Sequence, residues 1–285
     1  MRLYNLDGRA HLYTTDGLID VASTSEGRFP SDPQQLYADW DDFAKWSGQF
    51  VTADVPLDSS DEARLGPPVT RPSQVFAIGL NYRAHAEETS LSAGNEDLPL
   101  VFTKFPSCVT GPYGDLRLSG DSVDWEVELV AVIGRTAHHV PVTEAWSYVA
   151  GLTVGQDYSD RRVQLRGSPA QFSLGKSFPG FGPLGPGLVS PDELTDPDSL
   201  QLSCTVNGEV VQLGDTKQMI HSVSEVVAML SEICGLRPGD LIFTGTPEGV
   251  GMARTPARYL SPGDIVESTI EGIGTIRQRC HGGAE

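Results

Sequence analysis

Two glutamates placed two residues apart, Glu126 and Glu128, stand at the entrance to an apolar run that continues to Gly134. Successive side chains on a strand point to opposite faces, so this spacing predicts that both carboxylates lie on one face. A third carboxylate, Asp157, follows the next apolar run, residues 148–155. Carboxylates gathered beside a buried strand repel each other and lose hydration unless a cation compensates them. The alternation also occurs on solvated strand faces, and the three residues alone leave that alternative open.

The three carboxylates would form an all-oxygen ligand set, which suits Mg²⁺ or Mn²⁺ with water or substrate in the remaining positions. Asp157, Arg161 and Gln164 stand at i, i+4 and i+7, and this spacing predicts one face of a short helix. That face would add a guanidinium able to bind a carboxylate through two nitrogens. Lys176 lies in an otherwise uncharged Gly-, Pro- and Phe-rich loop, where an ammonium is expected to meet an anion. Together these groups indicate a pocket for a small, metal-chelating oxo acid.

Five ordered segments between about Arg71 and Gln278 resemble the fumarylacetoacetate hydrolase family, in its short form similar to acylpyruvases and fumarylpyruvate hydrolases. The segments are residues 77–88 (AIGLNYRAHAEE), 124–129 (DWEVEL), 157–164 (DYSDRRVQ), 176–178 (KSF) and 241–251 (LIFTGTPEGVG). The resemblance implies a mixed β-sandwich roll for the catalytic domain and, usually, a homodimer. It agrees with the metal site predicted from the carboxylates.

A histidine and a glutamate, His85 and Glu88, stand three residues apart and would be neighbours on one helical turn. An imidazole oriented by a carboxylate can take a proton from water. The resemblance implies that this pair activates water on a mobile lid, and residues 85–98 are polar enough to form one. Taken alone, the pair also fits a surface histidine with an incidental neighbour. The resemblance further implies that the hydroxyl or amide of Thr246 holds the substrate carboxylate, with Gly245 allowing a close approach.

The predicted activity is hydrolysis of the carbon–carbon bond of an acylpyruvate, such as fumarylpyruvate or acetylpyruvate, to pyruvate and a carboxylic acid. The 2-oxo acid end would chelate the metal and be oriented by Arg161, Gln164 and Thr246, while the His–Glu pair activates water. Lys176 would add positive charge as the pyruvate enolate leaves. The same groups would serve a lyase, such as an oxaloacetate decarboxylase or a 2-oxo-4-enoate hydratase or isomerase. A non-catalytic metal-binding scaffold is a third alternative. In an enzyme, the loop 168–172 and the lid would line the distal pocket that sets substrate specificity.

The composition limits the partners that the protein can bind. Twenty basic residues against 38 acidic ones give a net charge of −18, which disfavours nucleic acid and anionic membranes. No apolar run reaches the ~18 residues of a membrane helix, and the first residues lack the apolar core of a signal peptide. The four cysteines show no C-x-x-C spacing. These features predict a cytoplasmic protein, and the predicted pocket indicates a small 2-oxo acid as its partner.

The elements that must position these groups are predicted to be mostly strands. Period-two alternation on both sides of the Asn207-Gly208 turn predicts a hairpin. Residues 222–230 show the apolar spacing of an amphipathic helix. We predict a β-rich α+β fold with a small N-terminal β domain and linker over 1–70, a catalytic domain over 71–280 and a tail over 281–285.

Overall fold

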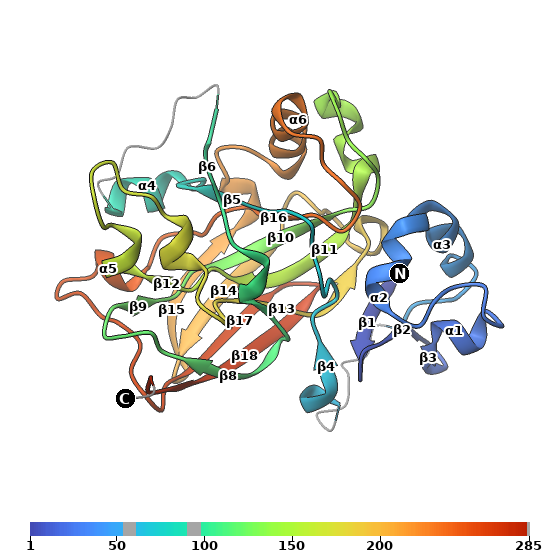
Figure 1. Cartoon of the computed structure of the whole chain (residues 1–285), viewed down its shortest axis with the longest axis horizontal. Helices are drawn as coiled ribbons and strands as arrows, with labels where there is room; N and C mark the ends of the chain where they lie inside the picture. The colour runs from blue at the N-terminus through green and yellow to red at the C-terminus, as the bar shows by residue number, and fades with distance from the viewer. Residues whose placement is uncertain (54–60, 90–97, 284–285) are drawn as a thin grey trace.

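Two β-sheets, surrounded by short helices, make up most of the fold (Figure 1). The computed structural model of the chain describes residues 1–53, 61–89 and 98–283. Within these residues the larger sheet has 11 strands and the second has five. Most neighbouring strands are antiparallel, and three pairs are parallel: β5 with β16, β7 with β13, and β8 with β18. The β-rich α+β architecture predicted from the sequence is confirmed.

The elements have the following bounds. The larger sheet has the order β3 (Gly17–Asp20), β2 (Arg9–Thr14), β1 (Arg2–Leu6), β13 (Gly182–Val189), β11 (Val149–Gln156), β10 (Val127–Ile133), β16 (Leu241–Phe243), β5 (Val75–Gly79) and β6 (Leu100–Thr103), with β4 (Leu65–Gly66) beside β1 and β7 (Val109–Thr110) beside β13. The second sheet has the order β15 (Glu209–Asp215), β14 (Gln201–Val206), β17 (Ile265–Ile270), β18 (Gly274–His281) and β8 (Tyr113–Arg117), and β12 (Ser159–Asp160) pairs with β9 (Val123–Asp124). The α-helices are α1 (Val21–Thr24), α2 (Pro33–Leu36), α3 (Trp40–Ser47), α4 (Arg83–Thr89), α5 (Arg161–Gln164) and α6 (Val223–Ile233). The 3₁₀ helices are η1 (Tyr37–Asp39), η2 (Glu62–Arg64), η3 (Pro106–Cys108), η4 (Val142–Tyr148), η5 (Ser173–Lys176), η6 (Pro191–Glu193), η7 (Thr216–Gln218) and η8 (Gly251–Ala253).

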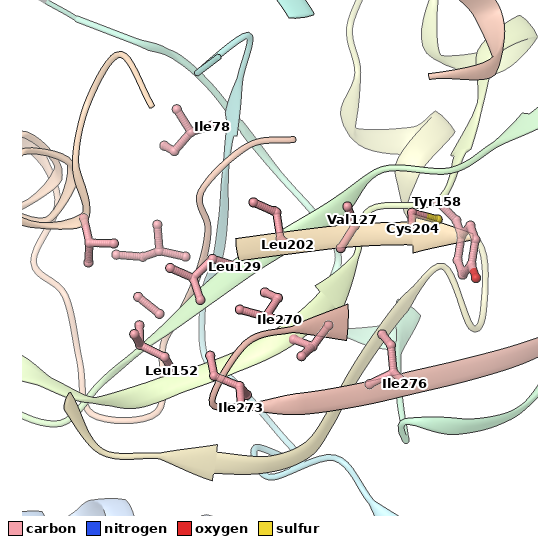
Figure 2. Close-up of a cluster of buried hydrophobic side chains, with 14 of the residues drawn as sticks. Ile78, Val127, Leu129, Leu152, Tyr158, Leu202, Cys204, Ile270, Ile273 and Ile276 are labelled. Carbon is pink, nitrogen blue, oxygen red and sulfur yellow. The ribbon is translucent and has the colours of Figure 1, made fainter. Parts of the chain in front are cut away.

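The two sheets pack against each other over a hydrophobic core. Figure 2 shows Val127, Leu129 and Leu152 of the larger sheet lying near Leu202 and Ile270 of the second sheet. All five side chains are buried. Burial of each such side chain contributes roughly 1.5–3 kcal/mol relative to leaving it exposed. The alternating apolar positions of both sheets therefore hold the sandwich together.

Strands β10 and β11 lie at the centre of the larger sheet and are buried along their whole length. A strand covered on both faces reads as a continuous apolar run rather than an alternating one. Their antiparallel register pairs Val127 with Gln156 and Glu128 with Gly155. The start of β10 is thus adjacent to the end of β11, where the chain continues into Asp157. This register brings the predicted carboxylates together at one end of these two central strands.

The N-terminal segment adds strands to the larger sheet. Strand β1 pairs with β13, where Leu3 lies opposite Leu188. Apolar side chains of this segment share a buried cluster with Val130 and Val132 of β10. The sheet and its core are continuous across the two parts of the chain, and the division into domains at residue 70 stays a prediction.

The predicted hairpin and helix are both confirmed. Asn207 and Gly208, between β14 and β15, have φ angles of 54° and 79°, as a two-residue turn with both central residues at positive φ requires. Helix α6 begins after Ser222, whose side chain accepts the Glu225 N–H while the Glu225 carboxylate accepts the Ser222 N–H. None of the helices in the described ranges combines the length and apolar character needed to cross a bilayer.

Candidate active site

Three carboxylates meet where β10 begins and β11 ends. Ligand oxygens of Glu126, Glu128 and Asp157 all lie within 4.8 Å of one another, and all three residues are buried. Glu126 precedes β10, and its backbone N–H donates to the Gln156 side chain at 2.8 Å. The predicted juxtaposition is therefore present, and burial rules out the solvated strand face.

Lys176, predicted to meet an anion, contacts two of these carboxylates. Its Nζ donates to Glu126 Oε2 and to Asp157 Oδ2, both at 2.7 Å, and to Ser159 Oγ at 2.8 Å. The residue ends η5 rather than lying in an extended loop, and it is almost fully buried. Its ammonium is thus part of the carboxylate cluster.

A second buried ammonium, that of Lys104, was not singled out in the sequence. Its Nζ donates to Asp157 Oδ1 at 2.6 Å, to the Phe181 carbonyl at 3.1 Å and to the Lys176 carbonyl. Lys104 follows the apolar strand β6, where a lysine commonly marks the solvated end of a strand. The signal that distinguishes it, a partner 53 residues away, is not visible in the local sequence.

The charges in the cluster do not balance at Glu128. Burial raises the pKa of the Glu126 carboxyl, yet Lys176 and Arg161 beside it hold that pKa at about 2. Burial and the neighbouring carboxylates Asp157 and Glu126 raise the pKa of Glu128 well above its usual range. Glu128 accepts a hydrogen bond from the Gly245 N–H at 2.8 Å, which is a neutral donor. A buried all-oxygen cluster with this unmet negative charge fits a hard divalent cation held by Glu126, Glu128 and Asp157.

Arg161 and Gln164 lie together on α5, next to the cluster. Arg161 Nη1 donates to Gln164 Oε1 at 2.8 Å and lies 2.7 Å from Glu126 Oε1. The prediction that Asp157 shares this helix is wrong. The Asp160 side chain accepts the Val163 N–H and caps the helix, so α5 begins at Arg161 and Asp157 lies outside it.

The predicted His85–Glu88 pair is formed on α4. His85 Nδ1 lies 2.8 Å from Glu88 Oε1, and the Gly249 N–H donates to the Glu88 carboxylate at 2.9 Å and 3.1 Å. His85 is buried and lines the same cavity as Glu126. The pair is therefore not an incidental surface contact. Of the predicted lid, residues 90–97 lie outside the described residues.

Gly245 and Thr246, predicted to bind substrate, contact strand β10. The Thr246 hydroxyl donates to the Val127 carbonyl at 2.8 Å and accepts from Gln212 Nε2 at 2.8 Å. Gly245 has a φ of +99°, and its N–H donates to Glu128. Both residues thus support the carboxylate strand, and Thr246 also lines the cavity. Their binding of substrate stays a prediction.

The cavity beside the carboxylates is small and has an apolar wall. Its free volume is about 20 Å³, close to that of a single water. Phe102 and Phe172 form an edge-to-face pair with ring centroids 5.7 Å apart, and Met252 lines the same wall. Phe172 comes from the predicted specificity loop 168–172, so that loop does contribute to the distal pocket. The remaining lining residues are Ile78, Gly79, Leu80, His85, Thr89, Glu126, Glu128, Arg161, Gln164, Lys176 and Thr246.

Comparison with known proteins identifies relatives of this chain. Residues 74–281 match the family described as fumarylacetoacetate (FAA) hydrolase C-terminal. The mitochondrial oxaloacetate tautomerase FAHD2A of Homo sapiens is 43% identical over 228 residues, which cover 79% of this chain and 72% of the relative. A solved structure of a candidate HpcE protein from Mycobacterium smegmatis is 51% identical with a TM-score of 0.92, covering 100% of both chains. Maleylpyruvate hydrolase from Sphingobium sp. SYK-6, solved with manganese(II) and pyruvate, is 25% identical with a TM-score of 0.77, again over 100% of both chains.

Proposed function

The chain belongs to the fumarylacetoacetate hydrolase family, and we propose that it is a divalent-metal-dependent enzyme that interconverts the keto and enol forms of oxaloacetate. The observation that carries the proposal is the buried cluster of Glu126, Glu128 and Asp157 on the wall of a cavity that also contains His85. A 2-oxo acid presents a carboxylate and a carbonyl oxygen, the pair of hard ligands that such a cluster leaves room for. The human relative named above is an oxaloacetate tautomerase.

The reaction needs a base at one carbon and positive charge at one oxygen. His85, held by Glu88, would remove a proton from C3 of the keto acid, and the electron pair would move to the oxygen at C2. The protonated His85 would then return that proton to the oxygen to give the enol. A bound divalent cation would supply positive charge at the 2-oxo oxygen.

The cationic side chains of the site would hold the substrate in place. Arg161 would pair with the substrate's C1 carboxylate, and Gln164 keeps the guanidinium in position through the hydrogen bond at 2.8 Å. Lys176, 2.7 Å from both Glu126 and Asp157, would add charge near the developing enolate. These contacts orient the acid before the proton moves, and orientation accounts for much of a catalysed rate.

The size of the cavity favours a short substrate. A free volume of about 20 Å³ is smaller than a four-carbon acid, so a 2-oxo acid must displace part of the wall formed by Phe102, Phe172 and Met252, and a short acid displaces least. The aromatic and thioether side chains of this wall lower the local polarity, which strengthens the electrostatic contacts inside the cavity. A tautomerase needs no water as a reactant, so a cavity with room for little besides the acid is compatible with it.

Hydrolysis of an acylpyruvate, the activity predicted from the sequence, is the second candidate. The His85–Glu88 contact at 2.8 Å favours it, because a histidine oriented by a carboxylate is suited to activating water. Decarboxylation of oxaloacetate would use the same groups without water. All three reactions pass through an enolate of a 2-oxo acid, and they differ in what attacks or leaves.

The test is a substrate panel with a matched pair of variants. Loss of the enol's ultraviolet absorbance is followed with oxaloacetate, and pyruvate release is followed with acetylpyruvate and fumarylpyruvate, each with Mg²⁺, Mn²⁺ and chelator. We expect a chelator-sensitive tautomerisation above the enzyme-free rate, lost in Glu126→Gln and retained in Glu232→Gln, whose exposed carboxylate lies outside the cavity. Pyruvate release from acylpyruvates without tautomerisation would replace this assignment with the hydrolase.

Three further expectations remain proposals. The partner is a small 2-oxo acid, with no nucleic acid or membrane among its ligands. The protein forms a homodimer, which light scattering will measure. Its location is cytoplasmic, although the human relative is named as mitochondrial, and fractionation of the source cells tests this.

A further inference from the structure

Asp124, the last residue of β9, is a fully buried carboxylate that the sequence did not single out. Its Oδ2 accepts from Arg161 Nε at 2.8 Å and from the Met252 N–H at 3.0 Å. Its Oδ1 accepts from the Gly251 N–H at 2.7 Å and from the Trp125 N–H at 2.9 Å. Four donors thus converge on one carboxylate, and they come from three separate parts of the chain.

The contact with Asp124 fixes one edge of the Arg161 guanidinium. Nε is bound to Asp124, and Nη1 donates to Gln164 and lies 2.7 Å from Glu126 Oε1. Nη2 lies 2.8 Å from Asp124 Oδ2 but has no hydrogen bond to any described residue, although it is buried. Asp124 thus holds the Nε and Nη2 edge of the guanidinium, and this contact sets the orientation in which Arg161 lines the cavity.

The contact between Asp124 and the loop after β16 is linked to the His85–Glu88 pair. Gly249 precedes η8, and its N–H donates to Glu88 while its carbonyl accepts from Trp125 Nε1 at 3.1 Å. Two residues later, a Cβ on Gly251 would clash with the Arg258 carbonyl oxygen and lie 2.7 Å from Asp124 Oδ1, so glycine is needed for both approaches. Asp124 therefore fixes the end of the short loop whose beginning anchors Glu88.

We propose that Asp124 is a positioning residue that couples Arg161, which binds the substrate, to the loop that anchors the His85–Glu88 pair. The inference rests on the proposed function, because it assigns Arg161 to the substrate and His85 to the base. Asp124 is not itself among the residues that line the cavity. By restraining both partners it keeps a fixed separation between the substrate's carboxylate end and the base. A displacement of about 1 Å in such an arrangement can lower a rate by about 100-fold.

The substitution Asp124→Asn tests this coupling with the shape of the side chain unchanged. The amide nitrogen of asparagine cannot accept, so donors from Arg161 or from the loop lose their partner. In protein loaded with Mn²⁺, we expect the Kd for oxalate, measured by calorimetry, to rise about tenfold, as loss of one charged hydrogen bond implies. We expect kcat on oxaloacetate to fall as well.

The control is Asp240→Asn, at a second buried carboxylate. Asp240 accepts from the Gln74 N–H at 2.9 Å and the Arg237 N–H at 2.8 Å, and it does not line the cavity. This variant is expected to lower Tm while leaving the oxalate Kd and kcat unchanged. If Asp124→Asn likewise loses only stability, Asp124 is a structural residue and the proposal is overturned.

A double-mutant cycle separates the two arms of the proposal. If Asp124 acts on oxalate through Arg161, the effects of Asp124→Asn and Arg161→Lys on the oxalate Kd will not add. Additive effects overturn the arginine arm. Oxalate binding does not require turnover, so a wild-type protein that binds oxalate but does not act on oxaloacetate contradicts the proposed function and still permits this test.

A second measurement covers the case in which Asp124→Asn does not fold. Arg161→Lys retains Asp124 but removes its Nε donor, and hydrogen exchange then reports on the Gly251 and Met252 amides. We expect these amides to exchange faster than in the wild type, because the Asp124 carboxylate that accepts from them no longer has a hydrogen bond from Arg161 Nε. Exchange at the wild-type rate overturns the coupling.

Discussion

Replacement of Lys104 with methionine would remove a buried positive charge while keeping a side chain of similar length. The Lys104 ammonium lies 2.6 Å from Asp157 Oδ1 and 3.1 Å from the Phe181 carbonyl oxygen, and its side chain has no exposed surface. Methionine leaves Asp157 with Lys176 as its remaining cation. Removal of one partner from a buried ion pair costs about 3–5 kcal/mol, and Lys176, which is shared with Glu126, would compensate the buried Asp157 charge only in part. We expect the free energy of unfolding of the metal-free protein to fall by that amount.

The assay is urea unfolding followed by tryptophan fluorescence, with Lys217→Met as the matched control. Lys217 Nζ lies 2.9 Å from Asp215 Oδ2, but its side chain is 63% exposed, so solvent screens the pair. Loss of such a surface pair costs about 0–1 kcal/mol. The argument from burial is refuted if the two variants lose stability to within about 1 kcal/mol of each other.

Three further predictions address the base, the pocket and the thiols. His85→Ala should lower kcat by about 10²-fold or more, as loss of a general base does, with Mn²⁺ affinity unchanged in calorimetry; an unchanged kcat would remove His85 from the mechanism. Phe172→Ala should shift kcat/KM toward 2-oxo acids longer than oxaloacetate, whereas Phe105→Ala, at an exposed position, should not; equal specificity in both variants would show that the aromatic wall does not set substrate length. Three of the cysteines are buried, namely Cys108, Cys204 and Cys280. Burial raises their pKa, to about 12 for the last two, so at pH 8 they are protonated and unreactive. A thiol reagent should therefore modify at most one thiol per native chain, that of the partly exposed Cys234, and four after unfolding; rapid reaction of more in the native state contradicts the burial.

The carboxylate cluster could be predicted because its signals are local. The alternation predicts that Glu126 and Glu128 point the same way, which holds although Glu126 lies just before β10. The apolar runs that form β10 and β11 are continuous, as buried central strands require. Asp157 follows the second run directly, so antiparallel pairing of the two strands was enough to bring it close. The His85–Glu88 pair needed one helical turn and nothing else.

The supporting contacts could not be predicted, because they join residues far apart in the chain. Lys104 meets Asp157 across 53 residues, and Asp124 meets Gly251 across 127. In the sequence each is a single charged residue at a strand end, which is typical of solvated positions. The start of α5 was misjudged for a different reason. The i, i+4, i+7 spacing of Asp157, Arg161 and Gln164 fits one helical face, but the Asp160 side chain accepts the Val163 N–H and begins the helix at Arg161.

The central claim is that the buried carboxylates hold a divalent cation, and calorimetric titration of Mn²⁺ into the metal-free protein tests it most directly. We expect one binding site per chain in the wild type, and at least a tenfold loss of affinity in Glu128→Gln, which keeps the shape of the side chain but removes the charge that its neighbours leave unmet. Failure of the wild type to bind Mn²⁺, or equal affinity in the variant, would contradict the account.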